Sequence, residues 1–199
     1  MDFESATPSI VKSIRQRDLL NTWLRLYAPA QVLPRLEAFQ PARFEEEFPD
    51  LVFMTVEQAA PPRLRIDSNG TRMSVAYGHT GKGRYLDDYL GTRLAPLVMP
   101  IYRKCLERAL PVYSVSHVDD TFGRLVAYER LLLPFSAESG VTHVIASLKT
   151  ISEDGSFEIR NLMRGNDSLP VTKHLAVIDR ELSHRLPGRI PPADQIEFN

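Results

Sequence analysis

The run Leu125-Val126-Ala127-Tyr128-Glu129-Arg130-Leu131-Leu132-Leu133-Pro134-Phe135 contains one of the longest apolar stretches of the chain. Its length and its leucines predict a largely buried strand. A second strand-like run, residues 111–117, precedes it, and a third, residues 141–150, follows it. The connections between the three runs are short, so we expect an antiparallel meander.

Two further strands are predicted upstream of the meander. Residues 51–57 are apolar on both faces, and residues 63–67 alternate leucine and isoleucine with charged side chains. Pro61 and Pro62 separate the two runs. The dipeptide Asn69-Gly70 is a turn signal, and taken alone it predicts a hairpin into residues 72–76.

Helical patterns surround these strands. Thr7 and Pro8 suit the cap and first position of a helix that extends to Tyr27, where Pro29 ends it. Short helical turns are predicted around residues 33–39 and 41–48. A longer helix precedes the meander, in which Pro100 marks either a kink or the start of the regular helix. Its apolar stripe consists of Leu94, Leu97, Val98, Ile101, Cys105 and Ala109.

This order of elements predicts an α+β fold, in which a five-stranded antiparallel sheet has helices over one face. We divide the chain into an N-terminal helix at residues 1–30, a central domain at 31–150 and a C-terminal extension at 151–199. The sequence predicts a helix over residues 171–186, with Leu175, Ile178 and Leu182 on one face. We expect the extension to be partly helical or loosely ordered, to add little to stability and to act as a contact or regulatory arm.

Composition excludes several classes of function. The chain has 199 residues, of which 43% are hydrophobic and 25% charged, and its formal net charge is −1. A near-neutral charge disfavours a general role in binding nucleic acid or an anionic membrane. Cys105 is the only cysteine, so the sequence predicts no intramolecular disulfide and no multi-thiolate metal site. No apolar run is long enough to span a bilayer and the N-terminus lacks a signal peptide, so we expect a cytoplasmic protein.

Several runs, in this order and spacing, resemble a bacterial family of PAS-like proteins that was first catalogued as a domain of unknown function. The resemblance covers roughly residues 19–150, and the run at 128–135 is its most distinctive part. It implies a PAS fold with a short helix, instead of a third strand, over residues 71–77. The runs are Leu19-Leu20-Asn21-Thr22-Trp23, Phe48-Pro49-Asp50-Leu51-Val52-Phe53, Gly70-Thr71, Gly83-Arg84-Tyr85-Leu86-Asp87-Asp88, Tyr102-Arg103-Lys104-Cys105, Leu110-Pro111-Val112-Tyr113-Ser114 and Tyr128-Glu129-Arg130-Leu131-Leu132-Leu133-Pro134-Phe135.

The resemblance also implies a non-enzymatic sensory or signalling module that binds a small organic ligand, a protein partner, or both. Flavin photosensors of this kind have an Asn-Cys-Arg-Phe-type run before the long helix, whereas Cys105 lies on that helix's apolar stripe. Haem-binding members usually offer a histidine there, and residues 92–110 contain none. Haem and flavin are therefore disfavoured, and the cofactor stays unknown.

No enzyme signature of the GxSxG, HExxH or CxxC type is present. His117 lies near Asp119 and Asp120, but polar residues at a strand end are commoner than an acid–base pair. The Gly-rich run at residues 78–83 lacks the spacing of a phosphate-binding loop. We predict neither a catalytic residue nor a metal site.

A PAS pocket would lie between the sheet and its covering helices. Our candidates for its polar lining are Tyr77, Tyr113, Tyr128, Arg130 and His143. Tyr128 and Arg130 share one face of their strand, whereas Glu129 points to the other face. A buried arginine must be paired; a protein carboxylate is the commoner partner, and the acid group of a ligand is the alternative.

The N-terminal helix carries more rings and leucines than one helix usually hides against one sheet. We therefore predict a homodimer through this helix, with a candidate interface of Leu19, Leu20, Trp23, Leu24 and Tyr27. Two other interpretations stay open. A packed interior without a cavity would favour a ligand-free interaction scaffold, and a deep polar pocket with a His–carboxylate contact would favour a small-molecule enzyme on a cone-shaped α+β fold.

Overall fold

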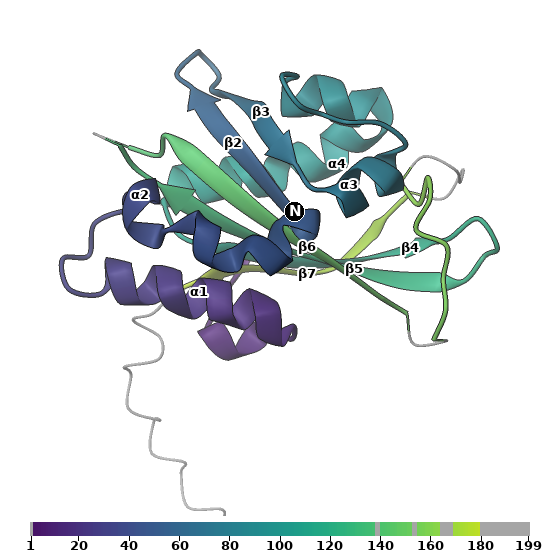
Figure 1. Ribbon diagram of the computed structural model, residues 1–199, viewed down its shortest axis with the longest axis horizontal. Coiled ribbons are helices and arrows are strands. Elements are labelled where there is room, and N and C mark those ends of the chain that lie inside the picture. Colours follow the sequence, from purple (N-terminus) through teal and green to yellow (C-terminus); the bar gives the residue numbers. More distant parts are fainter. Residues whose placement is uncertain (1, 138–139, 153–154, 164–168, 180–199) are drawn as a thin grey trace, which may run out of the picture.

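The computed structural model describes residues 2–137, 140–152, 155–163 and 169–179. It is an α+β fold built around one sheet (Figure 1). The strands are β1 (Glu4–Ala6), β2 (Leu51–Glu57), β3 (Arg63–Asn69), β4 (Val112–Asp119), β5 (Leu125–Phe135), β6 (His143–Ser152) and β7 (Val171–Ile178). The helices are η1 (Pro8–Ile10), α1 (Ile14–Tyr27), α2 (Leu36–Phe39), η2 (Pro41–Asp50), α3 (Thr71–Tyr77) and α4 (Leu86–Arg108).

The predicted five-stranded antiparallel sheet forms the larger part of the observed one. Strands β4, β5 and β6 make the expected meander, and β2 and β3 continue the sheet from β6. The described strands form a seven-stranded sheet in the order β1-β7-β4-β5-β6-β2-β3. The two additional strands lie beyond β4, where β7 pairs antiparallel with β4 and β1 pairs parallel with β7.

Helices cover both faces of the sheet: α3 and α4 lie over one face, and the N-terminal helix α1 lies with α2 over the other. Alternation along β5 divides its side chains between the two sides. Tyr128, Arg130 and Leu132 lie on the side covered by α3 and α4, which we call the α4 face. Leu131, Leu133 and Phe135 lie on the side covered by α1 and α2, which we call the α1 face. The two layers are visible on either side of the strands in Figure 1.

Helix α1 is anchored on the α1 face by both apolar and polar contacts. It begins after Ser13, whose side chain accepts a hydrogen bond from the backbone N–H of Gln16. Residues Pro8–Ile10 form a separate 3-10 turn, so the predicted single helix from Pro8 is wrong. The indole N–H of Trp23 donates to the backbone oxygen of Pro134 at 2.7 Å. Buried donors of this kind fix the orientation of the ring.

Leu19, Leu20 and Trp23 are fully buried inside one chain. They pack in the cluster that also contains Leu131 and Phe135 of β5. The argument that one helix cannot hide these side chains against one sheet is therefore wrong. Leu24 and Tyr27 are half-buried, and a homodimer through α1 stays a prediction that these two residues could serve.

The C-terminal extension contributes a strand to the sheet, not a helix. Residues predicted to be helical form β7, which is rich in β-branched side chains. Leu175, Ala176, Val177 and Ile178 of β7 are all buried. Residues 180–186 of the predicted helix and the last dozen residues lie outside the described part of the chain.

The segment before β7 also belongs to the folded core. Leu162 and Met163 are buried in the core of the α4 face. The backbone N–H groups of Asn161 and Met163 donate to the backbone oxygens of Val75 and Ala76 in α3, each at 3.0 Å. This segment therefore holds the C-terminal turn of α3 in place.

Helix α3 occupies the position that the family resemblance predicts, and the hairpin alternative is wrong. Its N-terminus follows Gly70, whose backbone N–H donates to the backbone oxygen of Leu51 at 2.8 Å. This approach leaves no room for a side chain, because a Cβ at Gly70 would overlap the backbone carbonyls of Phe48 and Pro49. Glycine is required here for close packing.

Helix α4 is broken at Gly91, whose φ of +69° and ψ of 178° are not helical. Pro96 and Pro100 both lie inside the helix with helical backbone angles, so the regular part of the helix does not start at Pro100. The long segment after Gly91 carries the apolar stripe as predicted, with Leu94, Val98, Ile101 and Cys105 buried.

Replacing Gly70 with alanine should lower the free energy of unfolding by about 3 kcal/mol or more, because backbone has to move to relieve the overlap. Gly83→Ala is the matched control. Gly83 has a φ of +79°, and a Cβ added there would have no neighbouring atom within 4 Å, so only backbone strain of about 1–2 kcal/mol is expected. Urea unfolding of both variants measures the difference. Equal losses would contradict the close approach at Gly70.

Ending the chain after Ser152 should leave the protein insoluble or lower its melting temperature by more than about 10 °C. This truncation removes β7 and exposes the edge of β4. It also deletes six buried apolar side chains, and burial of each large one stabilises the fold by about 1.5–3 kcal/mol. A chain that ends after Asp179 keeps every described element and serves as the control. Cooperative unfolding of the shorter chain at the control's melting temperature would show that the extension is dispensable.

Candidate functional site

A small cavity lies between the α4 face and helices α3 and α4, at the position predicted for a PAS pocket. Its volume is about 10 Å³, which is about the space of one water molecule. We call it the inner cavity. Its lining is largely apolar, with a few polar groups; the side chains are Val52, Ile66, Asn69, Met73, Tyr77, Leu86, Tyr89, Leu90, Val98, Tyr102, Tyr128, Arg130 and Leu148.

Among the described residues of this lining, Arg130 is the only one with a charged side chain. It is 3% exposed, and its Nε atom has no hydrogen-bond partner. Its Cζ atom lies 5.3 Å from the ring centroid of Tyr128 and 5.7 Å from that of Tyr102. Both distances fall within the range of cation–π attraction. The commoner of the two predicted partners, a protein carboxylate, is not observed, since no described acid forms an ion pair with Arg130.

Three phenol groups surround the guanidinium and stay protonated. Burial raises the pKa of Tyr77 to about 12 and raises those of Tyr102 and Tyr128 well above the ordinary value, although the charge of Arg130 works in the opposite direction. Burial also disfavours the charged form of Arg130, but the oxygens of Tyr102, Tyr128 and Tyr77 outweigh it, and its pKa is raised. The site therefore holds one permanent positive charge among neutral hydroxyl groups.

A larger pocket adjoins the inner cavity and opens to solvent. Its volume is about 250 Å³, and it shares Tyr77, Tyr89 and Leu90 with the lining of the inner cavity. We call it the outer pocket. The rings of Tyr77 and Tyr89, which line both spaces, lie 5.0 Å apart, and His79 stacks on Tyr89 at 4.8 Å. Arg84, Asp88, Arg93 and Met163 complete much of the rim.

The structure brings three of the five predicted pocket residues together. Tyr77, Tyr128 and Arg130 line the inner cavity. Tyr113 lies on the α1 face opposite Leu131, where its hydroxyl group meets the backbone N–H of Lys12 at 3.5 Å. His143 lies at the start of β6 opposite Phe135, with Nδ1 at 3.0 Å from the hydroxyl of Thr142. Neither Tyr113 nor His143 belongs to this site.

Sequence reasoning missed Met73, Tyr89 and Tyr102. The Tyr128 hydroxyl donates to the sulfur of Met73 at 3.6 Å, and the Tyr89 hydroxyl donates to the backbone oxygen of His79 at 3.0 Å. Tyr102 follows Val98 by four residues, so the helical stripe itself could have placed it on the buried face.

The chemistry of an acid–base catalyst is not assembled in the described residues. None of His79, His117, His143 and His174 forms an ion pair or a hydrogen bond with a carboxylate. Asp120 instead accepts hydrogen bonds from the backbone N–H groups of Phe122, Arg124 and Glu158. Burial raises the pKa of this carboxyl group, but the three donors outweigh burial and hold it below the ordinary value. Its role is to organise the β4–β5 turn.

Cys105 is buried on α4, and burial raises the pKa of its thiol, so the thiolate is disfavoured.

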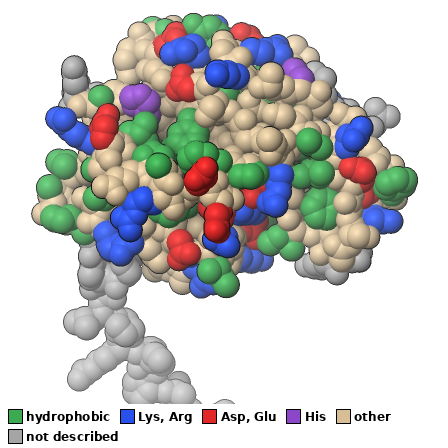
Figure 2. Space-filling model, viewed as in Figure 1, with side chains coloured by type: hydrophobic (Ala, Val, Ile, Leu, Met, Phe, Trp, Pro, Cys, Tyr) green, Lys and Arg blue, Asp and Glu red, His purple; other side chains and the backbone are tan. Residues whose placement is uncertain are grey.

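Within the described ranges, no group of three or more His, Cys, Asp or Glu side chains could hold a metal ion. Among the same residues, no helix combines the length and apolar character needed to cross a membrane. Figure 2 shows acidic and basic side chains interspersed over the viewed face.

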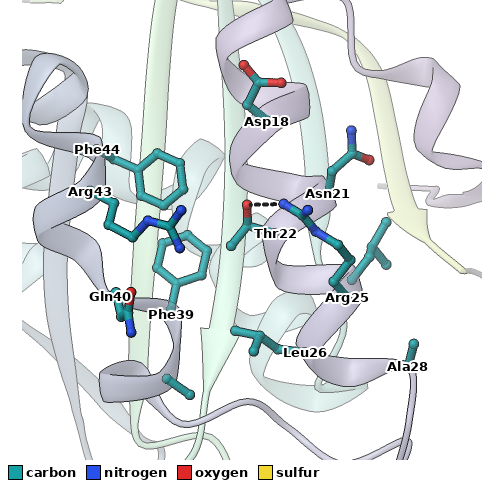
Figure 3. A pocket seen from close by; sticks show the side chains of 12 residues that line it. Asp18, Asn21, Thr22, Arg25, Leu26, Ala28, Phe39, Gln40, Arg43 and Phe44 are labelled. Carbon is teal, nitrogen blue, oxygen red and sulfur yellow. Dashed lines mark hydrogen bonds between the residues drawn. The ribbon is translucent and has the colours of Figure 1, made fainter.

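A second hollow, of about 1020 Å³, lies between α1 and the α2–η2 segment (Figure 3). Arg25 and Arg43 enter it from opposite sides, and Arg25 donates to the hydroxyl of Thr22 at 3.1 Å. Phe39 and Phe44 stack along one wall with ring centroids 5.1 Å apart. The described side chains around this hollow include no buried polar group without a partner.

A polar cluster lies beneath α1 and η2 on the α1 face. The ammonium group of Lys149 contacts Glu47 at 2.7 Å and Asp50 at 2.5 Å. Glu129 is 2% exposed, and its Oε2 atom lacks a hydrogen-bond partner, as does Oε1 of Gln16. The Gln16 amide donates to the backbone oxygen of Ser147 at 2.9 Å. Helix α1 therefore rests on an incompletely satisfied polar surface.

Comparison with known proteins gives one family. A family model described as "PAS domain" matches residues 11–148, which is more than half of the chain. No curated protein and no solved structure shows significant similarity to the chain. The matched range ends before the segment that contacts α3 and before β7.

The buried phenols predict a loss of stability at high pH. A tyrosine whose folded pKa is raised stabilises the fold fully below its unfolded pKa of about 10, and this contribution is lost as the pH rises through the folded value. For Tyr77 the loss should occur between about 10 and about 12. Phenolate absorbance and far-ultraviolet circular dichroism, followed together, should show several of the seven tyrosines ionising only as the protein unfolds. Titration of all seven near pH 10, before unfolding, would contradict the burial described here.

Proposed function

The chain belongs to the PAS domain family, whose members are generally sensory or signalling modules, and we propose that it senses a small organic molecule in the inner cavity and passes the signal to a protein partner. The observation that carries this proposal is a charged and phenolic lining inside an otherwise apolar core. Binding pockets have this composition, in which apolar walls supply affinity and a few polar groups fix orientation.

Binding requires the cavity to enlarge, and the structure offers one place for this. The inner cavity itself has room for about one water molecule. We propose that rotation of Tyr77 and Tyr89 joins it to the outer pocket, because both residues line both spaces. Met73, which also lines the cavity, is unbranched and adapts to irregular shapes.

Strand β5 offers a route from the cavity to a partner. Arg130 faces the cavity, and Glu129 and Leu131 face α1 from the same strand. A shift of β5 on ligand binding would therefore reach the polar contacts of α1, where Gln16 and Glu129 each have an unpartnered oxygen. We propose that a protein partner, or a second copy of this chain, binds α1 with an affinity that depends on the position of α1.

A ligand-free interaction scaffold is the competing function, and the small volume of the inner cavity favours it. The buried charge of Arg130 favours the sensor, because an interior that serves only packing is more stable without an unpaired charge. In both cases the chain acts without catalysis and contacts another protein.

Native mass spectrometry of freshly purified protein should distinguish the two functions. If the chain is a sensor, the spectrum should contain a bound molecule of a few hundred daltons or less that is lost on denaturation. This is the mass range of the ligands that binding pockets usually hold. The same spectrum reports whether the chain is a dimer. A spectrum that contains only the bare polypeptide mass, from several expression hosts, would count against the sensor and support the scaffold.

A further inference from the structure

We propose that the ligand of the inner cavity is a small monocarboxylic acid, and that its carboxylate binds the Nε edge of Arg130. This inference rests on the proposed function, since it names the class of ligand for the same cavity. The feature that carries it is the unsatisfied guanidinium, not the shape of the cavity.

The charge of Arg130 lacks a counter-charge among the described residues. The side chain is 3% exposed, its Nε atom has no partner, and no described acid forms an ion pair with it. Glu129 is adjacent in the chain but lies on the α1 face. A guanidinium cannot lose its proton to escape this situation. An anion from outside the chain would supply the missing charge.

The surroundings of Arg130 suit an anion with one negative charge. Tyr77 and Tyr102 keep their protons, so they can donate O–H groups to an anion while adding no charge of their own, whereas the Tyr128 hydroxyl already donates to Met73. A single guanidinium balances one negative charge. A phosphate carrying nearly two charges would leave an excess charge at low dielectric, which is costly.

A carboxylate matches the geometry of the guanidinium edge that carries the unpartnered Nε atom. Its two oxygens can accept from Nε and one Nη of a guanidinium in the bidentate arrangement that is typical of arginine. A halide ion offers one centre and cannot take both hydrogen bonds in line. The structure therefore favours a carboxylate over chloride or phosphate.

The outer pocket offers room for the hydrocarbon part of the acid. Beyond Tyr77 and Tyr89 lies the outer pocket of about 250 Å³, whose rim includes His79 and Arg84. The described side chains of this lining include the cations Arg84 and Arg93 and the anion Asp88, so cations outnumber anions there, and such an excess raises the local concentration of anions. We infer that the carboxylate enters past these rings and that the carbon chain occupies the space they leave.

The test uses the full chain and a series of sodium salts at constant ionic strength: acetate, butyrate, hexanoate, chloride and phosphate, with the neutral amides of the same acids as controls. Isothermal titration calorimetry should detect binding of at least one carboxylate and no binding of its amide. Arg130→Met should weaken that binding at least about tenfold, which corresponds to 1.4 kcal/mol. Arg17→Met, on the exposed surface of α1, is the matched control and should bind like the wild type.

Arg130→Lys keeps the charge but not the planar fork, so it should show intermediate affinity. The amide comparison requires only the wild type and stands even if both Arg130 variants fail to fold. Equal binding of acid and amide, or a chloride effect as large as that of the carboxylates, would overturn the inference. A neutral molecule found in the cavity by native mass spectrometry would overturn the ligand class and leave the sensor function standing. Absence of every bound species in both measurements would overturn both.

Discussion

Strand β5 is buried on both faces, and most of the architecture follows from this constraint. From Tyr128 to Phe135 every side chain is buried. A strand in this position cannot sit in a sheet that is open to water on one side, so the chain has to supply a layer of helix for each face. Helices α3 and α4 cover one side, and α1, α2 and η2 cover the other. The β4 edge also needs a partner, which β7 provides.

The same alternation couples two polar sites that have no direct contact. Arg130 projects into the inner cavity, and Glu129 projects beneath α1. Each of these buried groups has an oxygen or nitrogen without a partner. An unsatisfied buried group costs about 1–3 kcal/mol, so both sides of β5 hold free energy that a ligand or a rearrangement can recover. A ligand at Arg130, as proposed above, would therefore act on the strand that positions α1.

Sequence patterns predict the local elements of this protein better than their relations in space. The five central strands and α3 lie within a few residues of their predicted positions, because hydrophobic alternation and turn signals are local. Tyr128 and Arg130 share one face as predicted, since residues two apart in a strand must do so. Period two does not fix the register between strands, so it cannot place Tyr113 and His143, which pair with residues of the α1 face. The apolar spacing in residues 171–186 predicts a helix, but residues 171–178 form β7 because they pair with the free edge of β4. No local sequence pattern shows that this edge is free.

The retention of a charge in so small a cavity is itself informative about function. Replacing a buried ionic group with a well-packed apolar side chain is often neutral or stabilising by about 1–4 kcal/mol. At position 130, Leu132 and Leu148 supply apolar neighbours on the same face of the sheet, and a leucine or methionine would complete the core. A chain that served only as a scaffold would gain stability from that residue. On the proposed function, arginine at this position would cost stability in the absence of an anion and recover it when one binds, which is the thermodynamic behaviour of a sensor.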